Sequence, residues 1–141
     1  MERRTLVRAS LGFLFVSTAF TGLSAAVVPH SFYADFPYVT HWVDLLPPYN
    51  EHLVTDVGEL YLGFAILFGW ATWKMDPAFF RPLCAAWLLP SVLHLLFHAT
   101  HLGSFGTADA IEEIAALALT VAPAILVLWA SQPESATHVR R

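Results

Sequence analysis

Three histidines, His94, His98 and His101, are separated by four and three residues along the chain. On an α-helix such positions lie on one face, so the three imidazoles would form a stripe. A pair of histidines one turn apart is how helices present nitrogen ligands to zinc or iron. The spacing therefore indicates a metal-ligating helix face.

Carboxylates that could complete such a site occur in two other segments. His52, Asp56 and Glu59 repeat the same spacing in the preceding apolar segment. Three further acids open the last apolar segment: Asp109, Glu112 and Glu113. Imidazole nitrogens and carboxylate oxygens together bind zinc, iron, manganese and copper. We therefore predict a site for a divalent transition metal (zinc, iron or copper) with one open position and the ligands His94, His98, His101, Asp56, Glu59 and Glu113.

Glu59 and His94 are predicted to be the deepest ionisable groups, on the order of 10 Å below the helix ends at the helical rise per residue. An ionised carboxylate is costly in hydrocarbon, and no Lys or Arg in these segments can neutralise it. We therefore predict that both side chains point into the bundle, within reach of one ligand or one hydrogen bond. In this position they would be the catalytic acid and base.

Structural roles also account for some of these residues. Asp109 and Glu112 fit a helix N-cap and its partner three residues later, where negative charge is favourable. His52 and His101 could be solvent-exposed residues at the membrane–water interface, without a ligand. From the sequence alone, both interpretations stay open.

The elements that must position these residues are membrane spans. Of the 141 residues, 57% are hydrophobic and only 13% are charged, whereas a soluble domain carries about 25% charged residues. Four stretches reach the roughly 20 apolar residues that a spanning helix needs: 6–28, 50–73, 83–102 and 110–130. The apolar run of the first is longer than the core of a signal peptide, which favours a retained helix. We predict one all-α domain, a four-transmembrane-helix bundle.

The basic residues predict the orientation of this bundle. All seven lie before the first span, between the second and third, or after the fourth: Arg3, Arg4, Arg8, Lys74, Arg81, Arg140 and Arg141. By the positive-inside rule, both termini, the 74–81 turn and the tail 131–141 are cytoplasmic, in the cell (inner) membrane. Asp76 followed by Pro77 predicts a helix start. The short turn makes 50–73 and 83–102 an antiparallel hairpin, with the site at the outer mouth.

The connection 29–49 is longer and rich in aromatic residues and proline. Its six aromatics predict a segment in the outer interface, either as an anchor or as a lid over the site: Phe32, Tyr33, Phe36, Tyr38, Trp42 and Tyr49. In the span that follows, Gly58, Gly63 and Gly69 predict the close approach of another helix.

Composition also excludes several classes of protein. The single cysteine, Cys84, excludes an internal disulfide and a cysteine-based zinc site. A net charge of −4 without a basic run excludes an ordinary nucleic-acid-binding protein. The partners that remain are the lipid bilayer, a lipophilic substrate, and a larger membrane complex of which the chain would be a subunit.

Four segments resemble a group of small bacterial membrane proteins: Pro29-His-Ser-Phe-Tyr-Ala-Asp-Phe-Pro37, Pro48-Tyr-Asn-Glu-His-Leu-Val-Thr-Asp-Val-Gly58, His94-Leu-Leu-Phe-His-Ala-Thr-His-Leu102 and Ala108-Asp-Ala110. These proteins look like the DoxX-like class of four-helix integral membrane proteins, most of which are uncharacterised. The resemblance covers nearly the whole chain. It implies the four-helix fold and no activity.

Three functions are compatible with the sequence. The first is a metal-binding membrane protein, redox-active or not, with its site at the outer mouth. The second is a metal-free enzyme or carrier for a lipophilic substrate, in which Glu59 or Asp56 acts with His94 as acid and base. The third is an accessory subunit of a membrane complex. The polar stripes favour the first.

Overall fold

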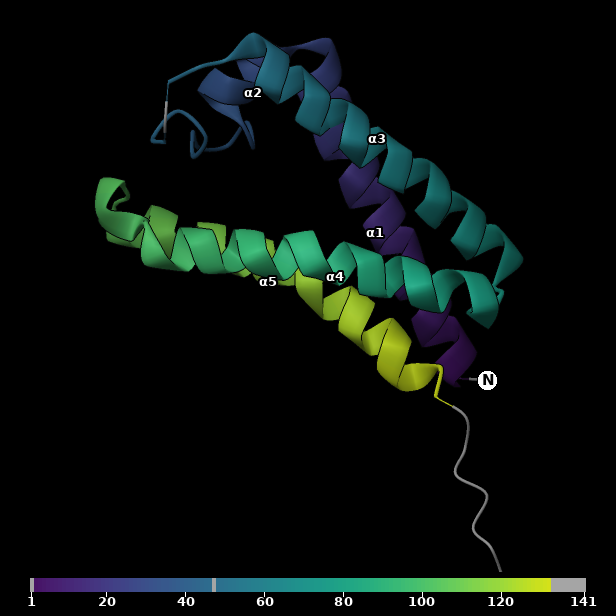
Figure 1. Ribbon diagram of the computed structural model, residues 1–141. Coiled ribbons are helices and arrows are strands. Elements are labelled where there is room, and N and C mark those ends of the chain that lie inside the picture. Colours follow the sequence, from purple (N-terminus) through teal and green to yellow (C-terminus); the bar gives the residue numbers. More distant parts are fainter. Residues whose placement is uncertain (1, 47, 133–141) are drawn as a thin grey trace, which may run out of the picture.

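The computed structural model describes residues 2–46 and 48–132, and the described residues form five α-helices (Figure 1). These are α1 (Glu2–Val27), α2 (Pro29–Asp35), α3 (Glu51–Lys74), α4 (Pro77–Thr100) and α5 (Thr107–Ala130), with a 3-10 turn at Leu102–Ser104. Four of them, α1, α3, α4 and α5, are long and apolar enough to cross a membrane. For the described residues the predicted all-α fold is therefore confirmed, with four helices that can span a membrane by length and composition. Most of the predicted tail, including Arg140 and Arg141, lies outside the described residues.

The α3–α4 hairpin forms where the sequence predicts it. The Met75 backbone ends α3 in the left-handed conformation, and its N–H donates to the Ala71 carbonyl. The Asp76 carboxylate then caps α4 by accepting from the Ala78 N–H at 2.9 Å, with Pro77 in the first turn. Asn50 caps α3 in the same way, accepting from the Leu53 N–H at 3.1 Å. These caps supply partners for N–H groups that a helix start leaves free.

The helices pack as two pairs, in which α3 lies along α1 and α5 lies along α4, and α1 also packs against α5. Glycine allows the first pair to pack closely. A Cβ atom on Gly58 would lie 2.8 Å from the Ala25 carbonyl carbon, and one on Gly22 would lie 2.9 Å from the Leu62 nitrogen. The prediction of close approach is thus confirmed at Gly58. It is wrong at Gly63, where a Cβ would meet nothing within 4 Å.

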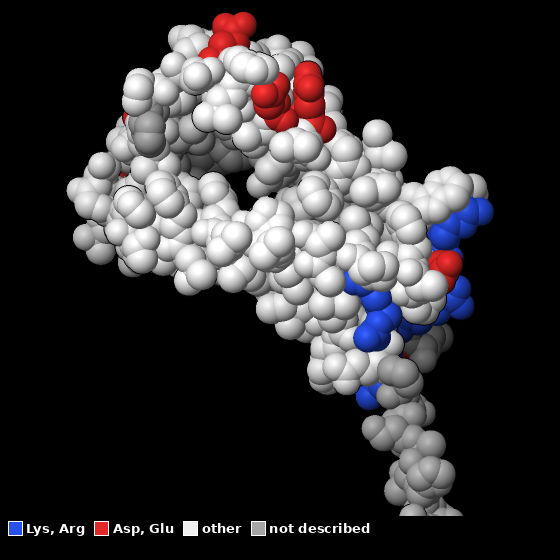
Figure 2. All heavy atoms as spheres, in the orientation of Figure 1, with Lys and Arg blue, Asp and Glu red and all other residues white. Residues whose placement is uncertain are grey.

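The hydrophobic core occupies the end of the molecule where α1 begins. Phe68 and Trp87 lie at its centre, with ring centroids 5.7 Å apart. The Trp87 indole also donates to the Thr120 carbonyl at 2.9 Å, which joins α4 to α5. Away from this core the two helix pairs diverge (Figure 1), and α3 makes few contacts with α4. We call the opening between the pairs the cleft; it is visible in the space-filling view of Figure 2.

Charge separates along the same axis. Figure 2 shows lysine and arginine gathered at the end where the helices converge, and acidic residues around the other end. We call these the basic end and the acidic end. The basic end carries Arg3, Arg4, Arg8, Lys74 and Arg81, accompanied by the acids Glu2 and Asp76. The same separation of basic from acidic residues was the basis for predicting the orientation of the bundle in the membrane. That the basic end is cytoplasmic stays a prediction.

Candidate functional site

The central feature of the acidic half is a buried contact between α4 and α5. The His98 Nδ1 atom lies 2.6 Å from the Glu113 Oε1 atom, and the two side chains are only 8% and 5% exposed. Both residues belong to the predicted ligand set. The short connection between α4 and α5 makes the two helices antiparallel neighbours, and this arrangement places the residues opposite one another.

This contact leaves hydrogen-bonding capacity unused. Within the described part of the chain, His98 Nδ1 and Glu113 Oε2 have no hydrogen-bond partner, so the 2.6 Å contact is not aligned as a hydrogen bond. Buried polar atoms are normally satisfied, and each exception calls for an explanation. Since the two side chains hold converging nitrogen and oxygen atoms, the pair is suited to bind or exchange a cation, either a proton or a metal ion.

His94 extends this pair by one helical turn. Its ring centroid lies 4.5 Å from that of His98, in an edge-on arrangement. Unlike His98, the His94 side chain is exposed on the protein surface. We refer to His94, His98 and Glu113 as the acidic-end triad. His94 is the exposed member of this triad, and the other two are buried.

The remaining predicted ligands are not drawn into this triad. The His101 Nδ1 atom lies 2.8 Å from the Phe97 carbonyl of its own helix, and its ring stacks on that of Phe97. Asp56 pairs with His52 on α3 at 3.2 Å, with the two side chains 50% and 87% exposed. Among the described residues, no group of three or more His, Cys, Asp or Glu is arranged to hold a metal ion.

Glu59 and His94 do not meet, in contrast to the prediction. Both side chains are exposed, and no hydrogen bond or ion pair joins them within the described residues. The prediction assumed that consecutive spans stay in contact along their whole length. Instead α3 follows α1 and turns away from α4, so residues at equal depth on the two helices are separated.

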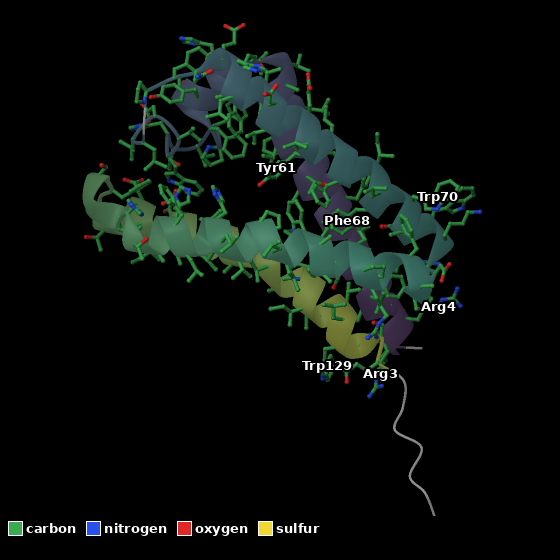
Figure 3. All side chains as sticks on the ribbon, viewed as in Figure 1. Arg3, Arg4, Tyr61, Phe68, Trp70 and Trp129 are labelled. Carbon is green, nitrogen blue, oxygen red and sulfur yellow. The ribbon has the colours of Figure 1, made fainter. Side chains whose placement is uncertain are left out.

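The inner limit of the cleft contains residues that the sequence reasoning did not select. Tyr61 projects from α3 toward α4 (Figure 3), and its ring centroid lies 5.5 Å from that of Trp87. Phe64 packs on the same indole, with centroids 5.0 Å apart. The helical spacing of Tyr61, Phe64 and Phe68 was the available signal. It is equally typical of ordinary core packing.

The segment between α2 and α3 carries a second polar contact at the acidic end. The His41 Nδ1 atom lies 2.9 Å from the Asp44 Oδ1 atom. The hydrogen bond and charge of Asp44, with smaller contributions from Asp109 and Asp35, raise the pKa of His41. Asp109 belongs to the first turn of α5. Whether the segment between α2 and α3 serves as an anchor or a lid stays a prediction.

No protein-family model, functionally characterised protein or solved structure matches this chain. The DoxX-like resemblance and the role as a subunit of a larger complex therefore stay predictions.

Proposed function

We propose that this chain is an integral protein of the cell membrane, with both termini cytoplasmic, that exchanges a proton with a lipophilic substrate in the cleft. His98 and Glu113 would form the acid–base pair, and His94 would relay to it. The observation that carries the proposal is the buried 2.6 Å contact between His98 Nδ1 and Glu113 Oε1. This pair takes the place of the predicted acid–base pair of Glu59 and His94.

The chemistry of this pair follows from charge. Among the described residues, no Lys or Arg contacts either side chain. A buried ion without compensation is very costly, so the pair is favoured with one proton, either as imidazolium and carboxylate or as imidazole and carboxylic acid. Both forms have no net charge. The pair stays neutral when the proton that it gives to one atom of the substrate is matched by a proton that it takes from another, as in general acid–base catalysis.

The cleft supports a substrate of lipid-like character. It opens between helix pairs whose outer surfaces are apolar, with Leu60, Leu93 and Leu96 all strongly exposed. A molecule dissolved in the hydrocarbon would reach it from the side without crossing water. The Tyr61 ring, which packs on the buried Trp87, would bound such a molecule at the inner limit.

The test compares small molecules that co-purify with three forms of the full chain. Wild type and Glu112→Gln are expected to retain the same lipophilic molecule in native mass spectrometry, and Glu113→Gln is expected to lose it. Glu112 is the matched control because it is the exposed neighbour of Glu113 on the same helix. Equal retention by Glu113→Gln, or retention of bulk phospholipid alone by wild type, would refute the proposal.

A second candidate is a metal site at the acidic-end triad. It is favoured by the His94 ring beside His98 and by the unpartnered Glu113 Oε2 atom. Zinc, iron or copper would be bound by His94, His98 and Glu113 after these side chains rearrange, because no group of three among the described residues is arranged to hold a metal ion. His101, Asp56 and Glu59 would stay outside. Elemental analysis separates this from the first candidate. Stoichiometric metal in wild type that His98→Ala abolishes selects the metal site, and substoichiometric metal in both rejects it.

A further inference from the structure

A pocket at the basic end, remote from the acidic-end triad, combines positive charge with an apolar wall. It has a volume of about 270 Å³ and lies where α1 begins, α4 begins and α5 ends. Arg3 and Arg4 line it on the α1 side. The rest of the lining is largely apolar: Val7, Met75, Pro77, Phe80, Ala130 and Ser131.

The two arginines of this pocket are not neutralised by neighbouring acids. Within the described residues, neither Arg3 nor Arg4 forms an ion pair. Among the described residues, the two acids at this end, Glu2 and Asp76, form no ion pair with either arginine, and neither lines the pocket. Arg81, by contrast, already has hydrogen-bond partners: its guanidinium donates to the Ser131 carbonyl at 2.9 Å and to the Ser131 Oγ at 3.2 Å. These two hydrogen bonds hold the end of α5 against α4 and so fix one wall of the pocket.

Tryptophan side chains surround the end of the molecule that holds the pocket. Arg3 and Arg4 share this end with Trp70 and Trp129 (Figure 3). Indole rings favour the membrane interface. The Lys74 ammonium lies 4.0 Å from the Trp73 ring centroid and makes a cation–π contact with it. A ligand at this height would have an anionic part at the arginines and an apolar part along the helix ends.

We infer that this pocket binds the phosphate of an anionic phospholipid, with Arg3 and Arg4 as the phosphate ligands. Arginine presents several donors in a planar fork that matches phosphate oxygens. Basic pockets between membrane helices are suited to such headgroups. The same chemistry would accept free phosphate, but the apolar wall favours a ligand that carries acyl chains. The inference does not depend on the proposed function, because none of its residues belongs to the triad.

The test reconstitutes the full chain with equal amounts of phosphatidylglycerol and phosphatidylcholine of identical acyl chains. Native mass spectrometry after detergent extraction counts the molecules of each lipid that stay bound. Wild type is expected to retain phosphatidylglycerol preferentially. The Arg3→Gln/Arg4→Gln variant is expected to lose about thirtyfold in that preference, the scale of two interfacial charges at about 1 kcal/mol each.

The matched control is Arg8→Gln/Lys74→Gln, which removes the same charge at the same end from residues that do not line the pocket. It is expected to keep the wild-type preference. An equal loss in this control would show a diffuse charge effect and overturn the inference. So would equal retention of the two lipids by wild type, a comparison that needs no variant to fold. Displacement of phosphatidylglycerol by inorganic phosphate, but not by chloride at the same ionic strength, would assign the pocket to free phosphate and overturn the lipid assignment.

Discussion

His98 and Glu113 meet within the α4–α5 hairpin, and the bond from Trp87 to the Thr120 carbonyl lies further along the same helix pair. The two contacts have the order of an antiparallel pair, since moving back along α4 from His98 to Trp87 moves forward along α5 from Glu113 to Thr120. The polar pair is therefore a property of the hairpin and needs no contribution from α3. This explains why it can stay buried although the two helix pairs have separated at this end.

The first prediction concerns the energy of this pair. Glu113→Ala and His98→Ala should each lower the free energy of unfolding by roughly 1 to 3 kcal/mol, because each leaves a buried polar partner unpaired. The double variant should cost less than the two single variants together, since it leaves neither group alone. Unfolding in mixed micelles measures all three. Strictly additive losses would show that the two side chains do not interact.

The second prediction uses the exposed pair His52 and Asp56, whose atoms lie 3.2 Å apart on α3. Pairs in solvent gain little because water screens them. His52→Ala should therefore leave stability unchanged within about 0.5 kcal/mol in the same unfolding assay. A loss as large as that of His98→Ala would mean that this pair has a buried role that the structure does not show.

The third prediction tests the approach of α1 to α3. Gly58→Ala should destabilise the protein by about 1 to 3 kcal/mol, because the new methyl group would overlap backbone that cannot rotate away. Gly63→Ala is the control on the same helix. It should be neutral or stabilising by up to about 1 kcal/mol, since its methyl group meets open space and alanine favours a helix. Similar effects of both changes would contradict the packing of α1 on α3.

The fourth prediction concerns pH. The pKa of His41 is raised above 6.5, chiefly by Asp44, so its contact with Asp44 is stabilising below pH 6.5 and is lost as the pH rises through the raised pKa. Titration of the His41 ring by NMR should show a midpoint above 6.5. Asp44→Asn should move it back toward 6.5, and Asp109→Asn should move it less. An unchanged midpoint in Asp44→Asn would exclude the contact.

The helices themselves are predictable because their signals are local. Apolar length defines the four spans, and Asp76 with Pro77 defines where α4 starts. The stripe of His94, His98 and His101 follows from the 3.6-residue period alone. None of these features depends on how one helix packs against another.

The pairing of the polar residues was not predictable in the same way. It depends on the angle between helices, which Gly22 and Gly58 influence by letting α3 follow α1. Residues on one stripe then reach different surroundings. His98 meets α5, His101 turns back to its own helix, and His94 stays exposed. Matching residues by depth assumes that neighbouring helices stay parallel, so it paired Glu59 with His94, and the structure leaves both side chains exposed.

The divergence of the two helix pairs has a mechanical consequence for the surrounding bilayer. The helices converge at the basic end and spread at the acidic end, so in a bilayer the molecule would be a wedge that occupies unequal areas in the two leaflets. A leaflet that is bent outward has spare area between its headgroups, and the broad end of a wedge fits there at lower elastic cost. In small vesicles the chain should therefore insert with its acidic end on the convex surface. Its unfolding there should also require more denaturant than in flat bilayers of the same lipid.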